Sequence, residues 1–404
     1  MTMTINNEHK KLNVPNLRFP EFQGEWEKYE LENLSTEIGD GIHATPIYDD
    51  NGTYYFVNGN NISEYGIAIT STTQRVTEAE ACRNNATMLC SETILLSING
   101  TIGNVALYKG EPIMLEKSAC YINVSSKVNR HYLFHYLMMP KCQFYFISEL
   151  TGTTIKNLSL KSVRKTKVSL PDMKEQKRIA QLFDTINDRI ATQSKIIEDL
   201  KKLKSAIINY AINSLDTDFA KFSSLYEMAG EGGTPTTSNA SFYDNGKIPF
   251  IKIDDLKQKY LTENKDFITE LGLQKSSAWL VPTHSILFSN GATIGEITIT
   301  TYPVCTKQGI LGIVPKENID VEFLYYFMSS SYFKKAVSRI VTEGTMKTAY
   351  LKDINNILCP IPTKEEQQEI AKMPSALNSK IDLEQSILKL FCSQKQHLLR
   401  QMFI

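Results

Sequence analysis

The chain has 404 residues, enough for two or three domains, and its 42% apolar and 22% charged residues are ordinary for a soluble globular protein. Lys and Arg number 44, and Asp and Glu also number 44, so the zero net charge does not by itself indicate a nucleic-acid binder. No apolar run approaches the ~18 residues typical of a membrane span, and residues 1–13 lack the apolar core of a secretory signal.

The cysteines favour reduced thiols. All 7 are scattered, at positions 82, 90, 120, 142, 305, 359 and 392, without the paired spacing of a disulfide framework or a zinc site. We therefore expect a cytoplasmic protein with no bound metal.

In chain order, residues 1–170 are predicted to form a mixed α/β domain, with residues 1–13 disordered. Short β-branched and aromatic runs at 54–57 and 94–97 predict strands between Gly, Asn, Asp and Pro turns. Periodic apolar residues over 130–146 predict a helix.

Residues 171–213 are predicted to form a long helix, because apolar side chains recur every three or four residues along one seam. The seam residues are Ile179, Leu182, Ile186, Ile190, Ile197, Leu200 and Ile207.

Residues 214–361 are predicted to form a second α/β domain, with strands at 248–251 and 297–301 and a helix over 321–341. Residues 362–404 are predicted to form a second long helix. Its seam residues are Ile370, Met373, Leu377, Ile381, Leu388, Phe391 and Leu398.

These segments form an internal repeat. The sequence ILLSINGTIG from Ile94 returns as ILFSNGATIG from Ile286, about 190 residues later, with six of ten positions identical. Further landmarks keep the same order and, to within one residue, the same offset: Gly-Thr at 152–153 and 344–345, Leu-Pro or Ile-Pro at 170–171 and 361–362, Glu-Gln at 175–176 and 366–367, and Ile-Ala at 179–180 and 370–371. The chain is therefore predicted to be a tandem duplication with pseudo-twofold organisation.

The two long helices most simply pack as an antiparallel coiled-coil spacer. Two seam positions are polar in both copies, as Gln193 and Glu384 and as Lys204 and Lys395, and polar seam residues often fix register. Pro374 replaces Phe183 in the second helix, and a mid-helix proline costs ~3 kcal/mol. This predicts a kink or break near residues 372–375, with the first helix straight at the matching place.

Catalytic motifs find no support. The chain has no phosphate-binding Gly-rich loop and no Asn-Pro-Pro or Asp-Pro-Pro motif of an amino-methyltransferase. Pro171 and Asp172, followed by Glu175 and Lys177, resemble a nuclease set, but Asp172 and Glu175 also fit a helix capping box. The second copy keeps the capping box as Thr363 and Glu366 and loses the nuclease set, so we favour the cap.

His131 and His135 have metal-ligand spacing on a predicted helix. The second copy does not repeat them, and no third ligand is evident, so we favour a half-buried structural pair. Cys305 has no evident His partner for nucleophilic catalysis. We predict no catalytic residue.

Polar, Gly-rich loops recur in both copies and are the candidate DNA-contacting residues. Glycine lets backbone approach a phosphate or a groove edge, while hydroxyl, amide and amino groups can contact phosphates or base edges. The alternative is ordinary turn chemistry. The candidates in the first domain are Asp40, Gly41, His43, Thr45, Asn58, Asn60, Asn61, Asn99, Thr101, Lys117, Gly152, Thr153, Thr154 and Lys156. Those in the second are Gly232, Gly233, Thr234, Thr236, Lys252, Asp254, Asn290, Thr293, Lys307, Gln308, Gly344, Thr345 and Lys347.

Several of these segments resemble the specificity subunits of bacterial type I restriction-modification enzymes. PNLRFPEF from Pro15 with GEW from Gly24 is similar to their opening, and DGIHATP from Asp40 and GGTP from Gly232 are similar to the starts of their target-recognition domains. The Gly-Thr loops leading to Glu-Gln-x-x-Ile-Ala resemble the entry to their spacer helices. The resemblance covers nearly the whole chain.

The resemblance implies that residues 1–170 and 214–361 are target-recognition domains, each reading half of a bipartite, asymmetric site in double-stranded DNA. The helices would set the gap between the halves and dock two methyltransferase subunits, with restriction subunits completing the complex. S-adenosylmethionine, ATP and Mg²⁺ would be bound by those partners and not by this chain. Pro374 puts the second helix's continuity, and its grip on one methyltransferase subunit, in question.

Local basic clusters partly offset the neutral net charge. Lysines and arginines gather at 161–167, at 174–178 and at 201–204, where they can contact phosphates or simply solvate a helix surface. Two alternatives stay open: a protein-interaction scaffold that uses only the helices, and an autonomous DNA-modifying enzyme. The recognised bases are not predictable from loops of unknown conformation.

Overall fold

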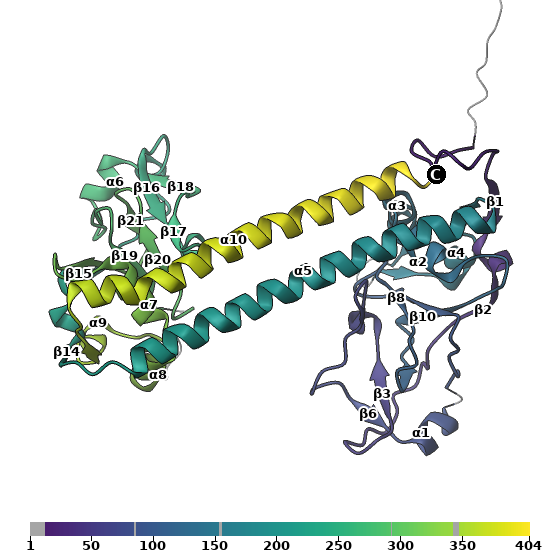
Figure 1. The fold of residues 1–404 in the computed structure, drawn as a ribbon, viewed down its shortest axis with the longest axis horizontal. Helices are drawn as coiled ribbons and strands as arrows, with labels where there is room; N and C mark the ends of the chain where they lie inside the picture. The colour runs from purple at the N-terminus through teal and green to yellow at the C-terminus, as the bar shows by residue number, and fades with distance from the viewer. Residues whose placement is uncertain (1–12, 85, 153–155, 292, 342–346) are drawn as a thin grey trace, which may run out of the picture. The chain divides into compact units, whose positions relative to one another are not determined.

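The computed structural model describes residues 13–84, 86–152, 156–291, 293–341 and 347–404 (Figure 1). The chain divides into two compact units, Met1–Lys195 with Ser386–Ile404 and Ile196–Gln385. Each unit contains one α/β head and part of both long helices, so the units cut across the four segments expected from the sequence. None of the described helices is long and apolar enough to cross a membrane.

The first head, residues 27–170, is built on an antiparallel four-stranded sheet. In sheet order its strands are β2 (Ser35–Asp40), β10 (Ala119–Val124), β7 (Thr93–Ser97) and β8 (Val105–Leu107). A second sheet contains β6 (Arg75–Val76), β3 (Tyr54–Val57) and β9 (Ile113–Leu115), with β9 parallel to β3. Two-stranded pairs join β1 (Glu27–Glu30) to β13 (Lys167–Leu170), β4 (Ile62–Ser63) to β5 (Gly66–Ile67), and β11 (Leu150–Thr151) to β12 (Asn157–Leu158).

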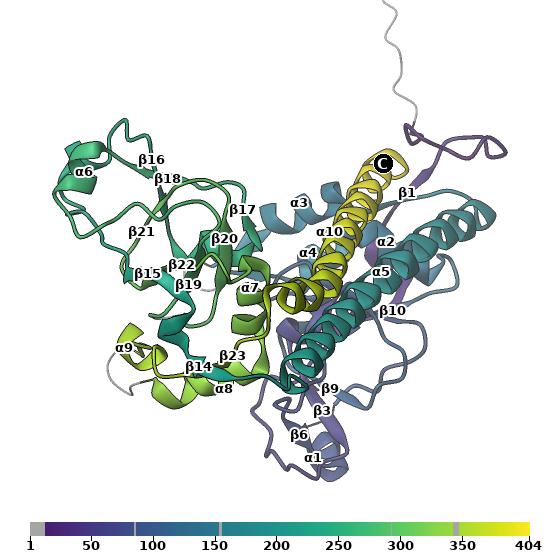
Figure 2. The same cartoon turned by 60° about the vertical axis from the view of Figure 1, so that its left-hand side comes forward.

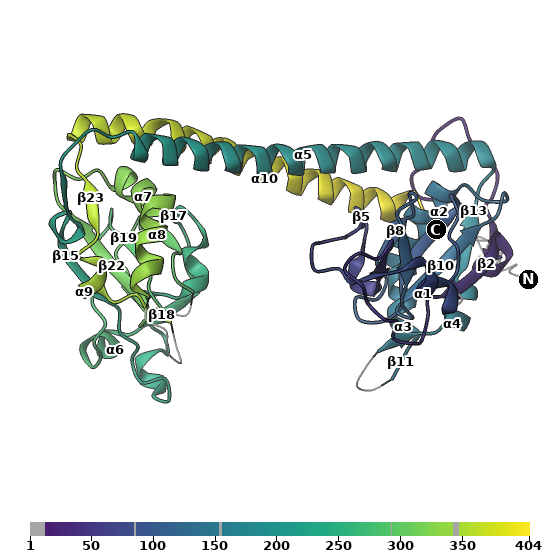
Figure 3. The ribbon, with the colours of Figure 1, turned by 90° about the horizontal axis from the view of Figure 1, so that it is seen from below.

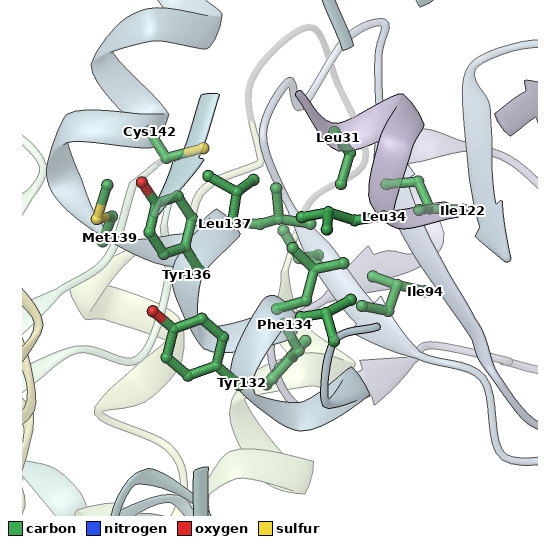
Figure 4. Close-up of a cluster of buried hydrophobic side chains, with 14 of the residues drawn as sticks. Leu31, Leu34, Ile94, Ile122, Tyr132, Phe134, Tyr136, Leu137, Met139 and Cys142 are labelled. Carbon is green, nitrogen blue, oxygen red and sulfur yellow. The ribbon is translucent and has the colours of Figure 1, made fainter. Parts of the chain in front are cut away.

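Helices cover the first head and bury its core. They are η1 (Leu31–Leu34), η2 (Gly59–Asn61), α1 (Glu78–Arg83), α2 (Arg130–Met138), α3 (Pro140–Ser148) and α4 (Leu160–Arg164). Figure 4 shows Tyr132 and Tyr136 of α2 among Leu31, Leu34 and Ile94, all of them buried. The aromatic α2 therefore supplies much of the apolar area that stabilises this head.

The second head, residues 219–360, has the same general plan. Its five-stranded sheet contains β15 (Tyr226–Glu231), β22 (Ile310–Pro315), β19 (Ile286–Ser289), β20 (Ile297–Thr300) and β17 (Tyr260–Leu261). Its smaller sheets contain β18 (Asp266–Ile268), β16 (Ile248–Ile251) and β21 (Cys305–Thr306), and β14 (Phe219–Lys221) paired with β23 (Leu358–Pro360).

Helices α7 (Val321–Ser329) and α8 (Ser331–Ile340) lie beside the five-stranded sheet (Figures 2 and 3). The shorter helices of this head are η3 (Phe222–Ser224), η4 (Ala240–Phe242), η5 (Ile253–Lys257), α6 (Glu270–Gln274) and α9 (Leu351–Ile354).

The predicted strands are confirmed as β3, β7, β16 and β20, but each predicted head helix is two helices. In the first head, Met139 is extended and Pro140 begins α3, because a proline disfavours helical backbone in the residue before it. In the second head, Ser330 is extended and caps α8 by accepting a hydrogen bond from the Phe333 amide.

Two long helices complete the chain, α5 (Met173–Asn213) and α10 (Lys364–Gln401). In the first unit the ring of Phe183 from α5 stacks on Phe403, just past the end of α10, with centroids 5.4 Å apart. In the second unit Lys204 Nζ, late in α5, donates to Asn378 Oδ1, early in α10, at 2.9 Å. The helices therefore run antiparallel.

The predicted seam is largely inward. Ile179, Ile186, Ile190, Ile197 and Ile381 are buried. The half-buried members are Leu182, Leu200, Ile207, Ile370, Leu377, Leu388, Phe391 and Leu398.

Met373 was wrongly placed in the seam, because its side chain is 60% exposed. The buried face of α10 passes through Ala371 and Pro374. Because each residue turns the helix by about 100°, Met373 points away from that face.

Of the kink or break predicted near Pro374, the break is wrong, because α10 continues from Lys364 to Gln401 with Pro374 inside it, and the kink stays a prediction. The ring is buried, and apolar packing offsets part of the cost of the missing amide donor.

The Glu-Gln landmark of the repeat joins each long helix to its head. Gln176 Nε2 donates to the Pro171 carbonyl at 2.9 Å, and its Oε1 accepts from the Asn129 amide at 2.8 Å. Asn129 is the N-cap of α2. In the second copy, Gln367 Oε1 accepts from the amide of Asp320, the N-cap of α7, at 2.7 Å. The repeat therefore preserves a junction that fixes each helix on its head.

The helix caps match the prediction only in part. Asp172 Oδ1 accepts from the Lys174 and Glu175 amides at 2.8 and 2.9 Å, as a capping residue does. The Glu175 carboxylate, however, is buried and holds Arg18 by two hydrogen bonds of 2.7 Å. The full capping box forms only in the second copy.

In that copy, the Glu366 carboxylate accepts from the Thr363 amide at 2.8 Å, and Thr363 Oγ1 accepts from the Glu366 amide at 3.3 Å.

The two predicted structural histidines also join a helix to the first head. His131 Nδ1 and His135 Nε2 lie 2.8 and 2.9 Å from the two carboxylate oxygens of Asp184 on α5. Burial alone would raise the pKa of Asp184, but its contacts with both histidines hold it well below its usual range.

The second copy uses different residues at the same junction. There Ser375 of α10 contacts Glu322 and Tyr326 of α7, at 3.0 and 3.1 Å, and Lys259 forms an ion pair with Glu322. Burial raises the pKa of Tyr326, so this phenol stays neutral.

Candidate nucleic-acid interface

Five predicted loop residues of the first head come together around one cavity of about 410 Å³. They are His43, Thr45, Asn58, Asn61 and Lys117. The first two follow the end of β2, Asn58 and Asn61 follow β3, and Lys117 follows β9. The ends of strands from two sheets therefore bring these side chains together.

Local hydrogen bonds shape the loop after β3. Asn58 Oδ1 accepts from the Asn60 amide at 2.9 Å, and Asn61 Oδ1 accepts from the Asn58 amide at 3.0 Å. Asn61 Nδ2 also donates to the Ala68 carbonyl at 2.9 Å. The oxygens hold the turn, which leaves the Asn58 Nδ2 amide as a donor for a ligand.

The sequence pattern missed much of the cavity wall. A polar run supplies Thr70, Thr72, Thr73 and Gln74. The rest of the wall consists of two aromatic, one acidic and two aliphatic residues: Tyr48, Phe56, Glu116, Ile42 and Ala44. The run TSTTQ from Thr70 is the signal that could have been found, because hydroxyl and amide groups cluster there without apolar periodicity. Tyr48 is 43% exposed, and its ring centroid lies 5.8 Å from that of Phe56.

The chemistry of this cavity suits recognition by hydrogen bonds. Thr, Asn and Gln side chains offer both donors and acceptors, which base edges require, and the exposed Lys117 can contact a phosphate. His43 Nε2 lies 3.0 Å from Asp40 Oδ2, so Asp40 orients a histidine at the cavity rim.

The repeated glycines Gly41 and Gly232 have a packing role. A Cβ atom at Gly41 would lie 2.1 Å from the Leu115 carbonyl oxygen, and one at Gly232 would lie 2.2 Å from the Thr306 carbonyl oxygen. Their amides donate to Ala119 and Ile310 carbonyls on the neighbouring strand. Close backbone packing is sufficient to explain why both glycines are repeated, and their contact with DNA stays a prediction.

A second group of predicted residues in the first head lies around η2. Thr101 Oγ1 donates to the Gly59 carbonyl at 2.9 Å, Asn60 is exposed, and Asn99 forms an isolated bridge with Asn157. Thr101 and Asn99 therefore hold neighbouring segments of the head together. Gly152 and Lys156 are exposed, and the predicted Thr153 and Thr154 lie outside the described residues.

In the second head, Thr234, Lys307 and Gln308 come together. The Gln308 amide donates to Thr234 Oγ1 at 3.3 Å, and the Lys307 and Gln308 side chains are exposed. Lys252 Nζ lies 2.8 Å from Asp266 Oδ1. Lys252 directly follows β16, and Asp266 begins β18, which pairs with β16.

Two of the remaining residues predicted for the second head are buried. Asn290 is buried and its amide donates to the Ala349 carbonyl, so it holds a loop. Gly233 is buried, and a Cβ atom there would meet Ser277 and Ala278. The other predicted residues are either exposed, as Thr236, Asp254, Thr293 and Lys347 are, or lie outside the described part of the chain, as Gly344 and Thr345 do.

The two heads have a similar backbone arrangement at these strand ends, but the side chains there differ. The Glu116 amide donates to the Val57 carbonyl, and the Lys307 amide donates to the Ile251 carbonyl, so these strand ends correspond. Counting one residue on, Lys117 corresponds to Gln308. Equivalent positions therefore present different hydrogen-bonding groups.

No metal-binding cluster is found in the described part of either head. Among those residues, no group of three or more His, Cys, Asp and Glu side chains could hold a metal ion. The nuclease-like set at the start of α5 is used in other ways, since Asp172 caps the helix and Glu175 binds Arg18.

Comparison with known families gives a match to both halves of the chain. A family model described as the type I restriction modification DNA specificity domain matches residues 23–202 and 217–390. Each match covers a head and the first part of the long helix after it.

Individual relatives agree with this match. The MjaVIII specificity subunit of a type I restriction enzyme from Methanocaldococcus jannaschii is 24% identical over 405 residues, covering 94% of this chain and 92% of the relative. The EcoBI specificity subunit from Escherichia coli is 25% identical over 314 residues, covering 70% and 65%. The crystal structure of a type I restriction-modification S subunit from M. genitalium shares the fold, with a TM-score of 0.58, 17% identity and coverage of 97% and 99%.

Proposed function

The chain belongs to the family of type I restriction-modification DNA specificity domains, and from this we propose that its two heads each read one half of a split, asymmetric DNA site. The proposal rests on one observation: the two heads have equivalent strand ends, and these ends carry different side chains. A duplicated frame suits two similar duplex segments, and different groups at Lys117 and Gln308 suit two different base sequences.

The long helices would set the distance between the half-sites. Helix α5 has 41 residues and α10 has 38, so each is about 60 Å long at ~1.5 Å per residue. Half-sites one DNA turn apart are separated by ~34–36 Å. Helices of this length are sufficient to bridge such a gap.

The helices would also dock partner proteins. In the second unit Ile196, Leu203 and Tyr210 of α5 recur every seven residues and are 40%, 48% and 77% exposed. A heptad-spaced apolar stripe in water is typical of a surface that packs against another helix. The partners would be two methyltransferase subunits, joined by restriction subunits.

Chemistry would belong to those partners. S-adenosylmethionine, ATP and Mg²⁺ would bind there, and this chain would act as a non-catalytic subunit in the cytoplasm. The purified chain with DNA, Mg²⁺ and S-adenosylmethionine should then neither cleave nor methylate DNA.

Selection from a random-sequence duplex pool tests the reading function. The full chain with its methyltransferase partner should enrich a motif of two unlike halves separated by a constant gap. A protein-interaction scaffold would enrich no motif. The chain alone should bind weakly in a gel shift, because partner subunits would supply much of the phosphate neutralisation.

A further inference from the structure

The second unit contains a cavity of about 640 Å³ between its head and its portions of the long helices. Its wall carries more positive than negative side chains. The lining lysines are Lys201, Lys204, Lys257, Lys259 and Lys334, and the lining carboxylates are Glu296 and Asp382. Such a local excess is notable in a chain with no net charge.

Two of these lysines already have carboxylate partners. Lys257 Nζ lies 2.7 Å from Asp254 Oδ1, and Lys259 forms an ion pair with Glu322. The remaining amino groups, those of Lys201, Lys204 and Lys334, belong to α5 and α8.

Lys204 is half-buried at the helix side of the cavity. Its Nζ donates to a neutral group, the Asn378 amide oxygen, at 2.9 Å. Burial lowers the pKa of Lys204; the charge of Asp382 opposes this, while the charges of Lys259, Lys201 and Lys334 lower it further. Three neighbouring ammonium groups therefore repel the charge of Lys204.

The duplication provides an internal comparison. Lys395, in the first unit, is the repeat equivalent of Lys204, which belongs to the second unit. Lys395 is buried and forms an ion pair with Glu64 from the β4–β5 turn. An anion from the head thus faces the seam lysine in one unit. In the other unit the corresponding space is the lysine-lined cavity.

We propose that this cavity binds a phosphate group, whose negative charge would serve Lys204 as the Glu64 carboxylate serves Lys395. Phosphate oxygens accept hydrogen bonds from several ammonium groups at once. Ligand pockets commonly measure ~300–1,000 Å³, so this one has room for a pyrophosphate, a nucleotide or a stretch of DNA backbone.

Calorimetric titration of the full chain with inorganic pyrophosphate tests the site without DNA, so its result is independent of base reading. We expect one site per chain, with affinity that falls as salt rises. Lys204→Gln should weaken binding about tenfold or more, because a charge-assisted hydrogen bond is lost. Lys395→Gln is the matched control and should leave pyrophosphate affinity unchanged.

A second variant guards against misfolding of the first. Asn378→Asp places a carboxylate beside Lys204 but loses the Asn378 donor to Asp382, so it should weaken pyrophosphate binding while the chain still melts in one cooperative transition. Equal pyrophosphate affinity in the native chain, Lys204→Gln and Asn378→Asp would overturn the proposal, as would absence of binding in the native chain.

Competition with duplex DNA distinguishes the two sources of phosphate. If the DNA backbone is the natural ligand, pyrophosphate displaces duplex, and Lys204→Gln weakens duplex binding for every sequence. If a free phosphate compound is the ligand, pyrophosphate and duplex bind together, and Lys204→Gln affects pyrophosphate alone.

Discussion

At the scale of single residues, the repeat preserves side chains for packing and varies those that face solvent. Gly41 and Gly232 occupy equivalent turns where backbone from Leu115 or Thr306 leaves no room for a Cβ atom. Gly41→Ala and Gly232→Ala should each destabilise the fold by about 1–3 kcal/mol, as overpacking does.

Urea unfolding measures this loss. Gly291→Ala is the control, since its Cβ atom would lie 3.4 Å from the nearest atom, in ordinary contact. Equal stability of all three variants would show that the two turns can relax and that the glycines are repeated for another reason.

The exposed glutamines near the strand ends should determine sequence preference. Gln74 lines the first-head cavity, and Gln308 lies beside Thr234 in the second head. Each alanine variant should relax preference at one base pair, costing about 1–3 kcal/mol, with Gln74→Ala affecting one half-site and Gln308→Ala the other. Binding to duplexes with single substitutions measures the effect. A uniform loss across all sequences would instead indicate phosphate contact.

The buried His135 at the first-head junction should make stability depend on pH. Burial holds the pKa of His135 below its ordinary 6.5, against the hydrogen bond to Asp184, so the unfolded chain takes up a proton more readily. Stability should therefore be fully present above pH 6.5 and decline as pH falls toward the lowered pKa. Asp184, with its own lowered pKa, contributes stability above its ordinary 3.8 that is lost only at still lower pH.

Melting temperatures between pH 8 and pH 5 test this. His135→Gln should flatten the dependence over that range, whereas the exposed control His397→Gln should keep it. An unchanged slope in His135→Gln would assign the titration to other groups.

At the scale of elements, periodicity predicted both long helices and the strands β3, β7, β16 and β20, because local pattern and burial agree there. The same periodicity predicted α2 and α3 as one helix, and α7 and α8 as one helix, because a single extended residue such as Met139 does not interrupt the apolar pattern.

The cavity residues were predicted less well. Asn58 and Lys117 line the site, but the buried Asn290 serves packing, and nothing in their sequence context separates these roles. Loop conformation decides which polar side chain faces outward, and it depends on contacts distant in sequence, such as that between Gln308 and Thr234.

Helix α10 should become more stable without its proline. Pro374→Ala restores an amide donor inside a continuous helix, where proline costs ~3 kcal/mol, less the packing lost with its buried ring. The melting temperature should rise. The reciprocal change Phe183→Pro should lower it strongly, because it also removes the stacking on Phe403. A lower melting temperature for Pro374→Ala would mean that the ring's packing outweighs the restored hydrogen bond.

At the scale of the whole molecule, duplication accounts for the main features. Each half carries a head, a junction built on Gln176 or Gln367, and a long helix, and the family model matches both halves. Differences between the copies are then expected where the copies meet different ligands, as at the equivalent positions Lys117 and Gln308.

The central claim is that the two heads read DNA separately. The most direct test replaces residues 27–170 with the corresponding head of a relative and maps methylated adenines in a genome expressing the chimera with its methyltransferase partner. We expect one half of the methylated motif to change while the other half and the gap stay constant. A motif that is unchanged, or altered in both halves, would contradict the claim.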